Sequence, residues 1–252
     1  AGVAAAVPDR EALRWRGRTV TYAELADRAT RLANVFTAHG LGAHTPRAEL
    51  APWESGQDFV GLYMLNGTEW LEATLAGYGA RVAPYNVNYR YVDEELTYLL
   101  NDAQTSALVY HARFAPRVAA VLPRLAKTPV LLQVADDSGE PLLPGAIDYE
   151  QAIAAASSDE PDLGHDPDDL YVLYTGGTTG MPKGTLWRQA DIWVASLGGD
   201  GLENLDVDAL AARAKNASAR LLPNAPFMHG AAHWLGMRCL LSGDTVVVND
   251  VV

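Results

Sequence analysis

Hydrophobic positions at the start of the chain change from a hairpin pattern to a helical one. The stretch 14–20 has the residues of a short β-hairpin, with Gly17 at its turn. Thr21 and Glu24 follow with the spacing of a capping box, in which two side chains satisfy backbone amides at the start of a helix. Apolar residues then recur at helical spacing until Gly40, which indicates an amphipathic helix packed against the core. These apolar residues are Leu25, Ala29, Leu32 and Phe36.

Short apolar segments alternate with segments of helical pattern from residue 59 onward, after a loop predicted at 41–58 from its prolines and glycines. Strands separated by helices of about 10–15 residues are typical of parallel βαβ units, whose sheets are covered by helices on both faces. We therefore predict an α/β fold of mostly parallel sheets covered by helices. The predicted strands are 59–65, 81–85, 107–110, 130–134 and 170–174, and the predicted helices are 69–78, 116–125 and one that begins near Asp93.

Two further segments bear on how the chain is divided. Residues 157–169 are acidic, rich in turn-forming residues and without a period, so we expect a solvated connection there. Residues 245–248 have the composition of a buried strand, and only four residues follow them. A strand of a βαβ sheet is ordinarily followed by its covering helix, so this ending indicates a truncated domain.

Composition narrows the class of protein. Hydrophobic residues make up 49% of the chain and charged residues 20%, which is ordinary for a globular protein and unlike a disordered one. The formal charge of −12 disfavours binding to nucleic acid, which needs a basic surface. No apolar run approaches the roughly 18 residues of a membrane span, so no integral membrane span is predicted. The single cysteine, Cys239, and the lack of a basic secretory n-region favour a cytoplasmic location.

The most informative chemistry follows the predicted strand 170–174. We call residues 175–183 the glycine-threonine loop. Its three glycines let the backbone approach a bulky anion with amides pointing inward, the threonine hydroxyls add donors, and Lys183 adds a mobile positive charge. Every part of the loop suits a polyphosphate. The predicted phosphate-binding residues are Thr175, Gly176, Gly177, Thr178, Thr179, Gly180 and Lys183.

Two common nucleotide-binding patterns do not fit this loop. The P-loop needs Gly-x-x-x-x-Gly-Lys-Ser/Thr, but Met181 and Pro182 separate Gly180 from Lys183. The dinucleotide pattern Gly-x-Gly-x-x-Gly is not met either. With the residues on either side of it, the loop closely resembles the signature of the adenylate-forming superfamily, Tyr-Thr-Ser-Gly-Thr-Thr-Gly-x-Pro-Lys-Gly. Only Gly176, in place of Ser, departs from that form, and the backbone donors remain.

Other segments resemble the same superfamily, in the correct order. Residues 19–25 are similar to its early Thr-Tyr-x-Glu-Leu element, and 77–88 contain its Gly-Ala-x-x-x-Pro-x-Asn element; both imply scaffold roles. Residues 226–230 resemble its Pro-x-x-His element, which implies that His229 lies beside the acyl-adenylate and contacts the reacting carboxylate region. The triplet 187–189, Trp-Arg-Gln, looks like the actinobacterial ligases that act on fatty or steroid side-chain acids.

The resemblance implies an ATP-dependent, AMP-forming acyl-CoA ligase. In this reaction a small-molecule carboxylic acid attacks the α-phosphorus of ATP, pyrophosphate leaves, and the thiol of CoA displaces AMP from the acyl-adenylate. The implied catalytic residues are Lys183 and His229, and the implied cofactors are ATP, Mg²⁺ and the co-substrate CoA. Residues 1–252 would form a partial N-terminal AMP-binding domain, with a first α/β subdomain at 1–165 and the start of a second at 166–252.

The superfamily's later elements do not occur in this sequence. These are a Tyr-Gly-x-Thr-Glu segment for adenine and Mg²⁺, an Asp for the ribose and a C-terminal domain with a catalytic Lys. We therefore expect this chain to be unable to complete ligation alone. A non-catalytic phosphate-binding or interaction module derived from such an enzyme is the main alternative. An adenylation domain that loads a carrier protein is a further alternative, and the insertion before Lys183 argues against a kinase.

Two features near residue 229 have competing interpretations. His229 and His233 have a spacing that could place two metal ligands on one helix face, but no Glu follows His229 and no third ligand is evident, so no metal ligand is predicted. A set of apolar residues could line a tunnel for an acyl chain or simply pack in the core. These residues are Phe227, Met228, Trp234, Leu235 and Met237.

Overall fold

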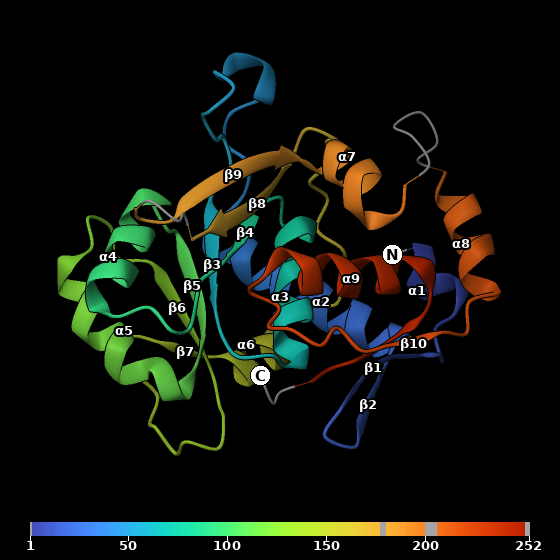
Figure 1. Cartoon of the computed structure of the whole chain (residues 1–252), viewed down its shortest axis with the longest axis horizontal. Helices are drawn as coiled ribbons and strands as arrows, with labels where there is room; N and C mark the ends of the chain where they lie inside the picture. The colour runs from blue at the N-terminus through green and yellow to red at the C-terminus, as the bar shows by residue number, and fades with distance from the viewer. Residues whose placement is uncertain (1, 177–179, 200–205, 250–252) are drawn as a thin grey trace.

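A computed structural model describes residues 2–176, 180–199 and 206–249 of the chain. Figure 1 shows a central sheet with α4 and α5 on one side and α2, α3 and α9 on the other. The hairpin of β8 and β9 lies across the top of this arrangement, and the strands β1, β2 and β10 lie below the helices. Within the described residues, no helix combines the length and hydrophobicity needed to cross a bilayer.

The N-terminal elements follow the local sequence signals. Helix α1 (Gly2–Ala6) precedes the antiparallel hairpin of β1 (Glu11–Trp15) and β2 (Arg18–Thr21). Its turn needs positive φ, which Arg16 (46°) and Gly17 (79°) both adopt. Helix α2 (Tyr22–Ala38) begins with the predicted capping box and ends just before Gly40, whose φ is +74°. The predictions of the hairpin and of this helix are confirmed.

Five parallel strands form the main sheet, in the order β4-β3-β5-β6-β7. Its strands alternate their side chains between two cores. Ala107 and Val109 pack with α2 and α3, whereas Leu108 and Tyr110 pack with α4 and α5. The prediction of parallel strands covered on both faces is therefore confirmed. The elements are β3 (Phe59–Tyr63), α3 (Thr68–Gly79), β4 (Ala83–Asn86), α4 (Asp93–Asp102), β5 (Ala107–His111), α5 (Ala115–Val121), β6 (Val130–Val134), β7 (Ile147–Asp148) and α6 (Tyr149–Ala155).

Two smaller sheets complete the molecule. The hairpin of β8 (Leu170–Thr175) and β9 (Lys183–Arg188) is antiparallel, and the other sheet has the order β10-β11-β1-β2. The sheet β10-β11-β1-β2 combines strands from both ends of the chain. The predicted division into two subdomains at 165/166 stays a prediction. The remaining elements are α7 (Gln189–Ile192), the π-helical turn η4 (Trp193–Leu197), α8 (Val207–Lys215), β10 (Arg220–Leu221), α9 (Gly230–Ser242) and β11 (Thr245–Val247).

Several predicted boundaries differ from the structure. The strand expected at 81–85 runs instead from Ala83 to Asn86, because Arg81 has a positive φ of 55° that an extended strand does not allow. The helix expected at 116–125 stops at Val121, and a 3-10 turn, η3 (Leu122–Arg124), follows, because Pro123 has no N–H for a further helical bond. The predicted loop 41–58 contains the 3-10 turn η1 (Arg47–Glu49), which projects at the top of Figure 1. The acidic connection ends on a buried residue, since Asp169 is only 6% exposed and accepts two hydrogen bonds from Arg81, both 2.8 Å long.

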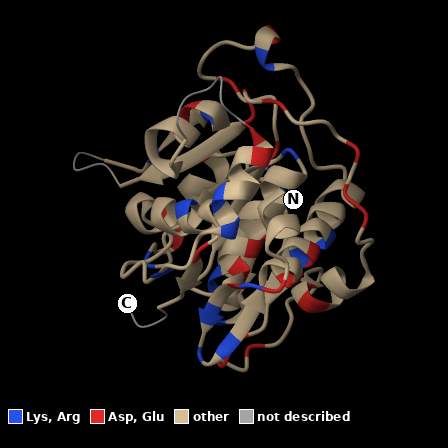
Figure 2. Cartoon of the chain, turned by 90° about the vertical axis from the view of Figure 1, so that its right-hand side faces the viewer, with Lys and Arg blue, Asp and Glu red and all other residues tan. Residues whose placement is uncertain are grey.

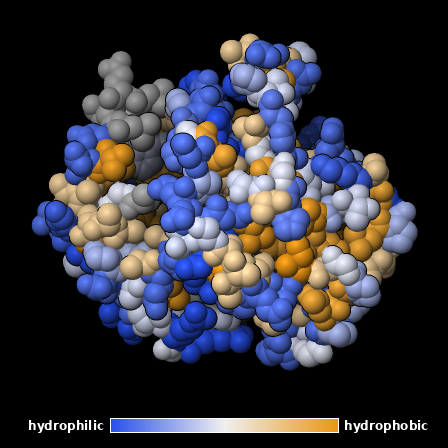
Figure 3. All heavy atoms as spheres, turned by 180° about the vertical axis from the view of Figure 1, so that it is seen from behind, coloured by the Kyte–Doolittle hydropathy of each residue, from blue (hydrophilic) through white to orange (hydrophobic). Residues whose placement is uncertain are grey.

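The surface shows how the net negative charge is distributed. Figure 2 shows Lys and Arg in short, separate segments with Asp and Glu nearby, rather than gathered into one basic face. Figure 3, which views the molecule from behind relative to Figure 1, shows apolar atoms gathered in the right half of that face among hydrophilic ones. The separation of the basic segments in Figure 2 gives a polyanion no broad basic surface on that side, so a phosphate ligand needs a locally built site.

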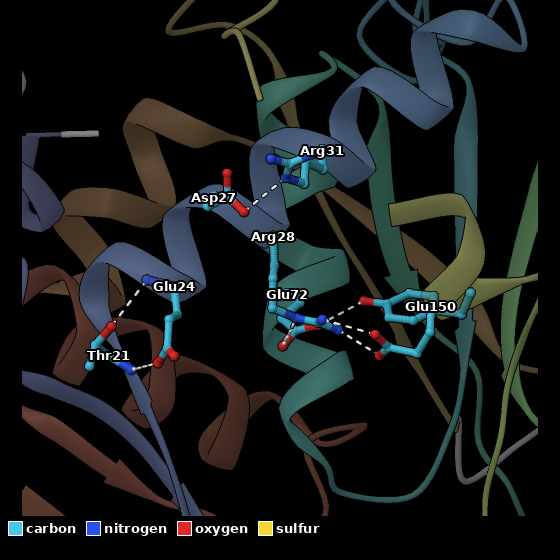
Figure 4. A network of polar contacts seen from close by, with 8 residues as sticks. Thr21, Glu24, Asp27, Arg28, Arg31, Glu72 and Glu150 are labelled. Atoms are coloured by element: carbon cyan, nitrogen blue, oxygen red, sulfur yellow. Dashed lines mark hydrogen bonds and ion pairs between the residues drawn. The ribbon is translucent and has the colours of Figure 1, made fainter. Parts of the chain in front are cut away.

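A buried ion pair joins α2, α3 and α6 beneath the sheet (Figure 4). Arg28 donates two hydrogen bonds of 2.9 Å to Glu72, whose side chain is fully buried. Tyr149 donates a third to the same carboxylate, at 3.0 Å. On its other side Arg28 holds the half-exposed carboxylate of Glu150 at 2.7 Å and 2.9 Å, and these bonds lower the pKa of Glu150. Because the carboxylate of Glu72 is fully buried, the guanidinium of Arg28 offsets the cost of removing it from water.

We predict that Arg28→Met destabilises the chain by about 3–5 kcal/mol, since it leaves the carboxylate of Glu72 buried without its cation. Urea unfolding followed by circular dichroism measures this change. Asp27→Asn is the control, because it breaks only the exposed pair of Asp27 with Arg31 and should cost about 1 kcal/mol or less. Equal losses in the two variants would show that the buried pair has no special role.

Candidate functional site

The glycine-threonine loop closes the β8–β9 hairpin. Thr175, the last residue of β8, lies opposite Lys183, the first residue of β9. Gly177, Thr178 and Thr179 lie outside the described residues. The described loop residues named as phosphate ligands all have exposed side chains or backbone, and Lys183 forms no ion pair with any part of the chain that the structure describes. Both ends of the loop are thus held together at an accessible position.

The base of this loop is fixed by a side chain from the neighbouring sheet. Asn86 is the last residue of β4, and its Oδ1 accepts a hydrogen bond of 2.8 Å from the backbone N–H of Tyr174. Its Nδ2 donates to the carbonyl of Tyr174, at 2.7 Å, and to the carbonyl of Met228, also at 2.7 Å. Both Nδ2 protons of Asn86 therefore donate to backbone carbonyls, one in each of two separate segments.

His229 lies at the N-terminus of α9, as the residue that precedes its first turn. Its φ and ψ of −102° and 134° are extended, and its side chain is exposed. A Cβ placed on Gly230 would lie 3.0 Å from a methyl group of Leu173 on β8, so the first turn of α9 packs directly against that strand. The structure therefore brings His229 and the glycine-threonine loop to the same region, each one residue beyond a contact of Asn86.

A second buried asparagine holds the segment before His229 from the other side. Asn66 accepts a hydrogen bond of 2.7 Å from the N–H of Phe227, and it donates to the carbonyls of Ala225 and Asn249 at 3.1 Å and 2.7 Å. Asn66 is only 3% exposed. The segment that leads to His229 is therefore held by Asn86 of β4 and by Asn66, which lies between β3 and α3.

His233 has a different environment from His229. Its Nδ1 lies 3.0 Å from the hydroxyl of Tyr171, which also accepts a hydrogen bond of 2.9 Å from Trp234. Burial lowers the pKa of His233 from its ordinary value of 6.5 to about 4, so the ring is neutral at pH 7. His229 precedes the first helical residue of α9, so the pair does not share one helical face as its spacing would allow.

The apolar residues near His229 divide into two groups. Phe227, Met228 and Met237 are almost fully buried and belong to the core shared by α2 and α3. Trp234 is half-buried, and Leu235 is 38% exposed. Their predicted role as an acyl tunnel stays a prediction, whereas core packing is observed for the first three.

Sequence reasoning did not identify the two asparagines as part of the site. Asn86 lies within the segment 77–88, to which the resemblance assigns a scaffold role, and no role is predicted for Asn66. The available signal was the same in both cases, namely a polar residue at the carboxyl end of an apolar strand. In α/β sheets ligands bind at that edge, so such residues are candidates for a site or for its support.

The chain is similar to known proteins along nearly its whole length. Residues 2–251 match the family described as AMP-binding enzyme, and the chain belongs to that family. It is 51% identical to the medium-chain acyl-CoA ligase Mig of Mycobacterium avium, over 99% of this chain and 46% of that protein. It is 38% identical to a 3-oxocholest-4-en-26-oate–CoA ligase of Rhodococcus rhodochrous, over 96% of this chain and 42% of that protein. The chain thus spans less than half the length of these relatives.

Solved structures share the fold. The N-terminal domain of FACL13 from Mycobacterium tuberculosis has a TM-score of 0.71 at 23% identity, covering 97% of this chain and 54% of that one. ATP-bound MatB from Rhodopseudomonas palustris has a TM-score of 0.72 at 23% identity, covering 98% of this chain and 44% of that one. The chain therefore shares its fold with about half of the N-terminal domain of FACL13 and with the matching part of MatB.

We predict that acid weakens the fold through the buried imidazole of His233. Below pH 6.5 the unfolded chain binds a proton at this residue, but the folded chain does not until about pH 4. The free energy of unfolding therefore falls as the pH is lowered through this window, by up to about 1.4 kcal/mol per pH unit for one proton. His233→Gln should make the curve less steep between pH 6.5 and 4 in urea titrations. An unchanged slope would show that His233 titrates equally in both states.

Proposed function

We propose that this chain carries the phosphate-binding and acid-activating part of an AMP-forming acyl-CoA ligase. The observation that carries the proposal is the hairpin that sets Thr175 opposite Lys183, beside the start of the helix that follows His229. Membership of the AMP-binding enzyme family supports the nucleotide, and the names of the relatives support fatty or steroid side-chain acids as substrates.

Each part of the site has a role in the first step. The backbone amides of the glycine-threonine loop and the ammonium of Lys183 bind the β- and γ-phosphates and stabilise the charge that develops on pyrophosphate as it leaves. His229 contacts the carboxylate that attacks the α-phosphorus. Holding the carboxylate and the triphosphate in line makes their reaction effectively unimolecular, which lowers its entropic barrier.

Magnesium enters this proposal with the nucleotide. Among residues 2–176, 180–199 and 206–249, no group of three or more His, Cys, Asp or Glu side chains is placed to hold a metal ion. We assign Mg²⁺ to ATP, where it would neutralise phosphate charge when bound. The thiol of CoA is the proposed acceptor in the second step. We also propose a cytoplasmic enzyme, since Cys239 is a buried free thiol.

The test is the exchange of labelled pyrophosphate into ATP by the protein produced from its natural reading frame. Medium-chain fatty, aromatic and steroid side-chain acids should be compared, and we expect exchange with the first or the last class. Binding of ATP without exchange on any acid would support the non-catalytic module. For the 252-residue chain alone we propose phosphate binding without acyl-CoA formation, and efficient acyl-CoA formation would contradict this.

We predict that Lys183→Gln lowers the exchange rate about 10²-fold, the usual effect of removing one donor to a developing anion. Lys215→Gln is the matched control, because Lys215 is an equally exposed lysine at the end of α8 and should leave exchange unchanged. The rate is measured at saturating acid with varied ATP. A Lys183→Gln variant with the wild-type rate would remove the loop from the mechanism.

A further inference from the structure

Strands β4 and β8 lie next to each other without belonging to one sheet. β4 is the edge strand of the five-stranded sheet, and β8 pairs only with β9 among the strands of the described chain. The side-chain amide of Asn86 fills this gap in the manner of a backbone peptide, since it both accepts from and donates to Tyr174. The second proton on its Nδ2 reaches the carbonyl of Met228, from a segment 142 residues later in the chain.

The residues that Asn86 holds are the last buried ones before the proposed reactive groups. Tyr174 is 7% exposed and Met228 is 3% exposed, whereas the next residues, Thr175 and His229, are both exposed. Consecutive Cα atoms are about 3.8 Å apart, so fixing Tyr174 and Met228 limits where the two following residues can lie. The planar side-chain amide of Asn86 thus binds the residue before Thr175 and the residue before His229.

Only asparagine supplies this set of bonds at this length. The site needs one acceptor for the N–H of Tyr174 and two donors for two carbonyl oxygens. An aspartate at position 86 would turn an oxygen toward both carbonyls, and an alanine would leave three buried backbone groups without these partners. Asn86 is itself only 9% exposed, which leaves little room for a longer side chain to adjust.

We propose that Asn86 is a positioning residue that sets the distance between Thr175, at the start of the glycine-threonine loop, and His229. The proposal rests on the function proposed above. Asn86 does not contact the reacting atoms, so its effect should fall on turnover more than on the binding of ATP. A displacement of about 1 Å between reacting groups can cost about 10²-fold in rate.

The test compares Asn86→Asp with the wild type in pyrophosphate exchange by the naturally expressed protein. We expect kcat to fall about 10²-fold while KM for ATP changes only a few-fold. The ratio of variant to wild-type kcat should rise as the pH falls, because a protonated carboxyl group can donate to one of the two carbonyls. A kcat equal to that of the wild type would overturn the proposal. If Asn86→Asp does not fold, Asn86→Ser, which keeps a single hydroxyl donor, replaces it with the same expected direction.

Thr105→Val is the control for a purely structural effect. It removes buried hydrogen bonds of 2.6 Å to Tyr85 on β4 and of 2.9 Å to the carbonyl of Leu100 on α4, and neither bond involves the loop or His229. We expect it to lower the melting temperature and to keep kcat. If the two variants lose activity in proportion to their loss of stability, Asn86 is a structural residue and the proposal fails.

A second measurement separates this proposal from the proposed function. Inorganic pyrophosphate is titrated into each protein, and the imidazole ¹H resonance of His229 is followed by NMR. We expect a shift in the wild type and in Thr105→Val, and its loss in Asn86→Asp. If the wild-type protein has no exchange activity, the ligase function is refuted. The titration would still test whether Asn86 couples pyrophosphate binding to His229. No response of His229 in the wild type would overturn the positioning role.

Discussion

The site depends on one constraint, which is that a buried backbone must keep its hydrogen bonds where two sheets meet. The parallel strands end at β4, and the hairpin of β8 and β9 begins a separate sheet beside it. An unpaired N–H or C=O in this interior would cost about 1–3 kcal/mol, so the junction needs a partner for each group. The amide of Asn86 provides it for Tyr174. The position of the glycine-threonine loop follows from that junction.

The same logic separates the two kinds of buried polar group in this molecule. Glu72 lies within α3, where its charge is neutralised by Arg28 and its role is to hold helices together. Asn86 is the last residue of β4 and Asn66 follows β3, and the partners of both are backbone groups of distant segments. Because the carboxyl edge of an α/β sheet is where ligands bind, amides placed there fix the walls of a site without adding charge to it.

Local sequence signals predicted most of the elements, because their causes are local. The capping box at Thr21, the turn at Gly17 and the strand alternation each depend on neighbouring residues, and the structure confirms them. The contacts of Asn86 could not be predicted in this way, since its partners lie 88 and 142 residues away. The residue types of the glycine-threonine loop made it a candidate phosphate site, but the antiparallel hairpin of β8 and β9 was not predicted. The early end of α5 was missed although Pro123 was visible in the sequence.

The change from buried to exposed backbone explains how one chain can be both rigid and reactive at this place. A phosphate loop needs backbone amides that can donate to the ligand. Such amides have no hydrogen-bond acceptor within the protein. Such a loop is loosely held unless the residue before it is fixed. Tyr174 and Met228 meet this need, since each is bound to the same buried amide, and exposure begins at the very next residue. Thr175 and His229, the proposed site residues, can therefore remain open to a ligand while the residues before them share one fixed partner, which is the arrangement that preorganised sites require.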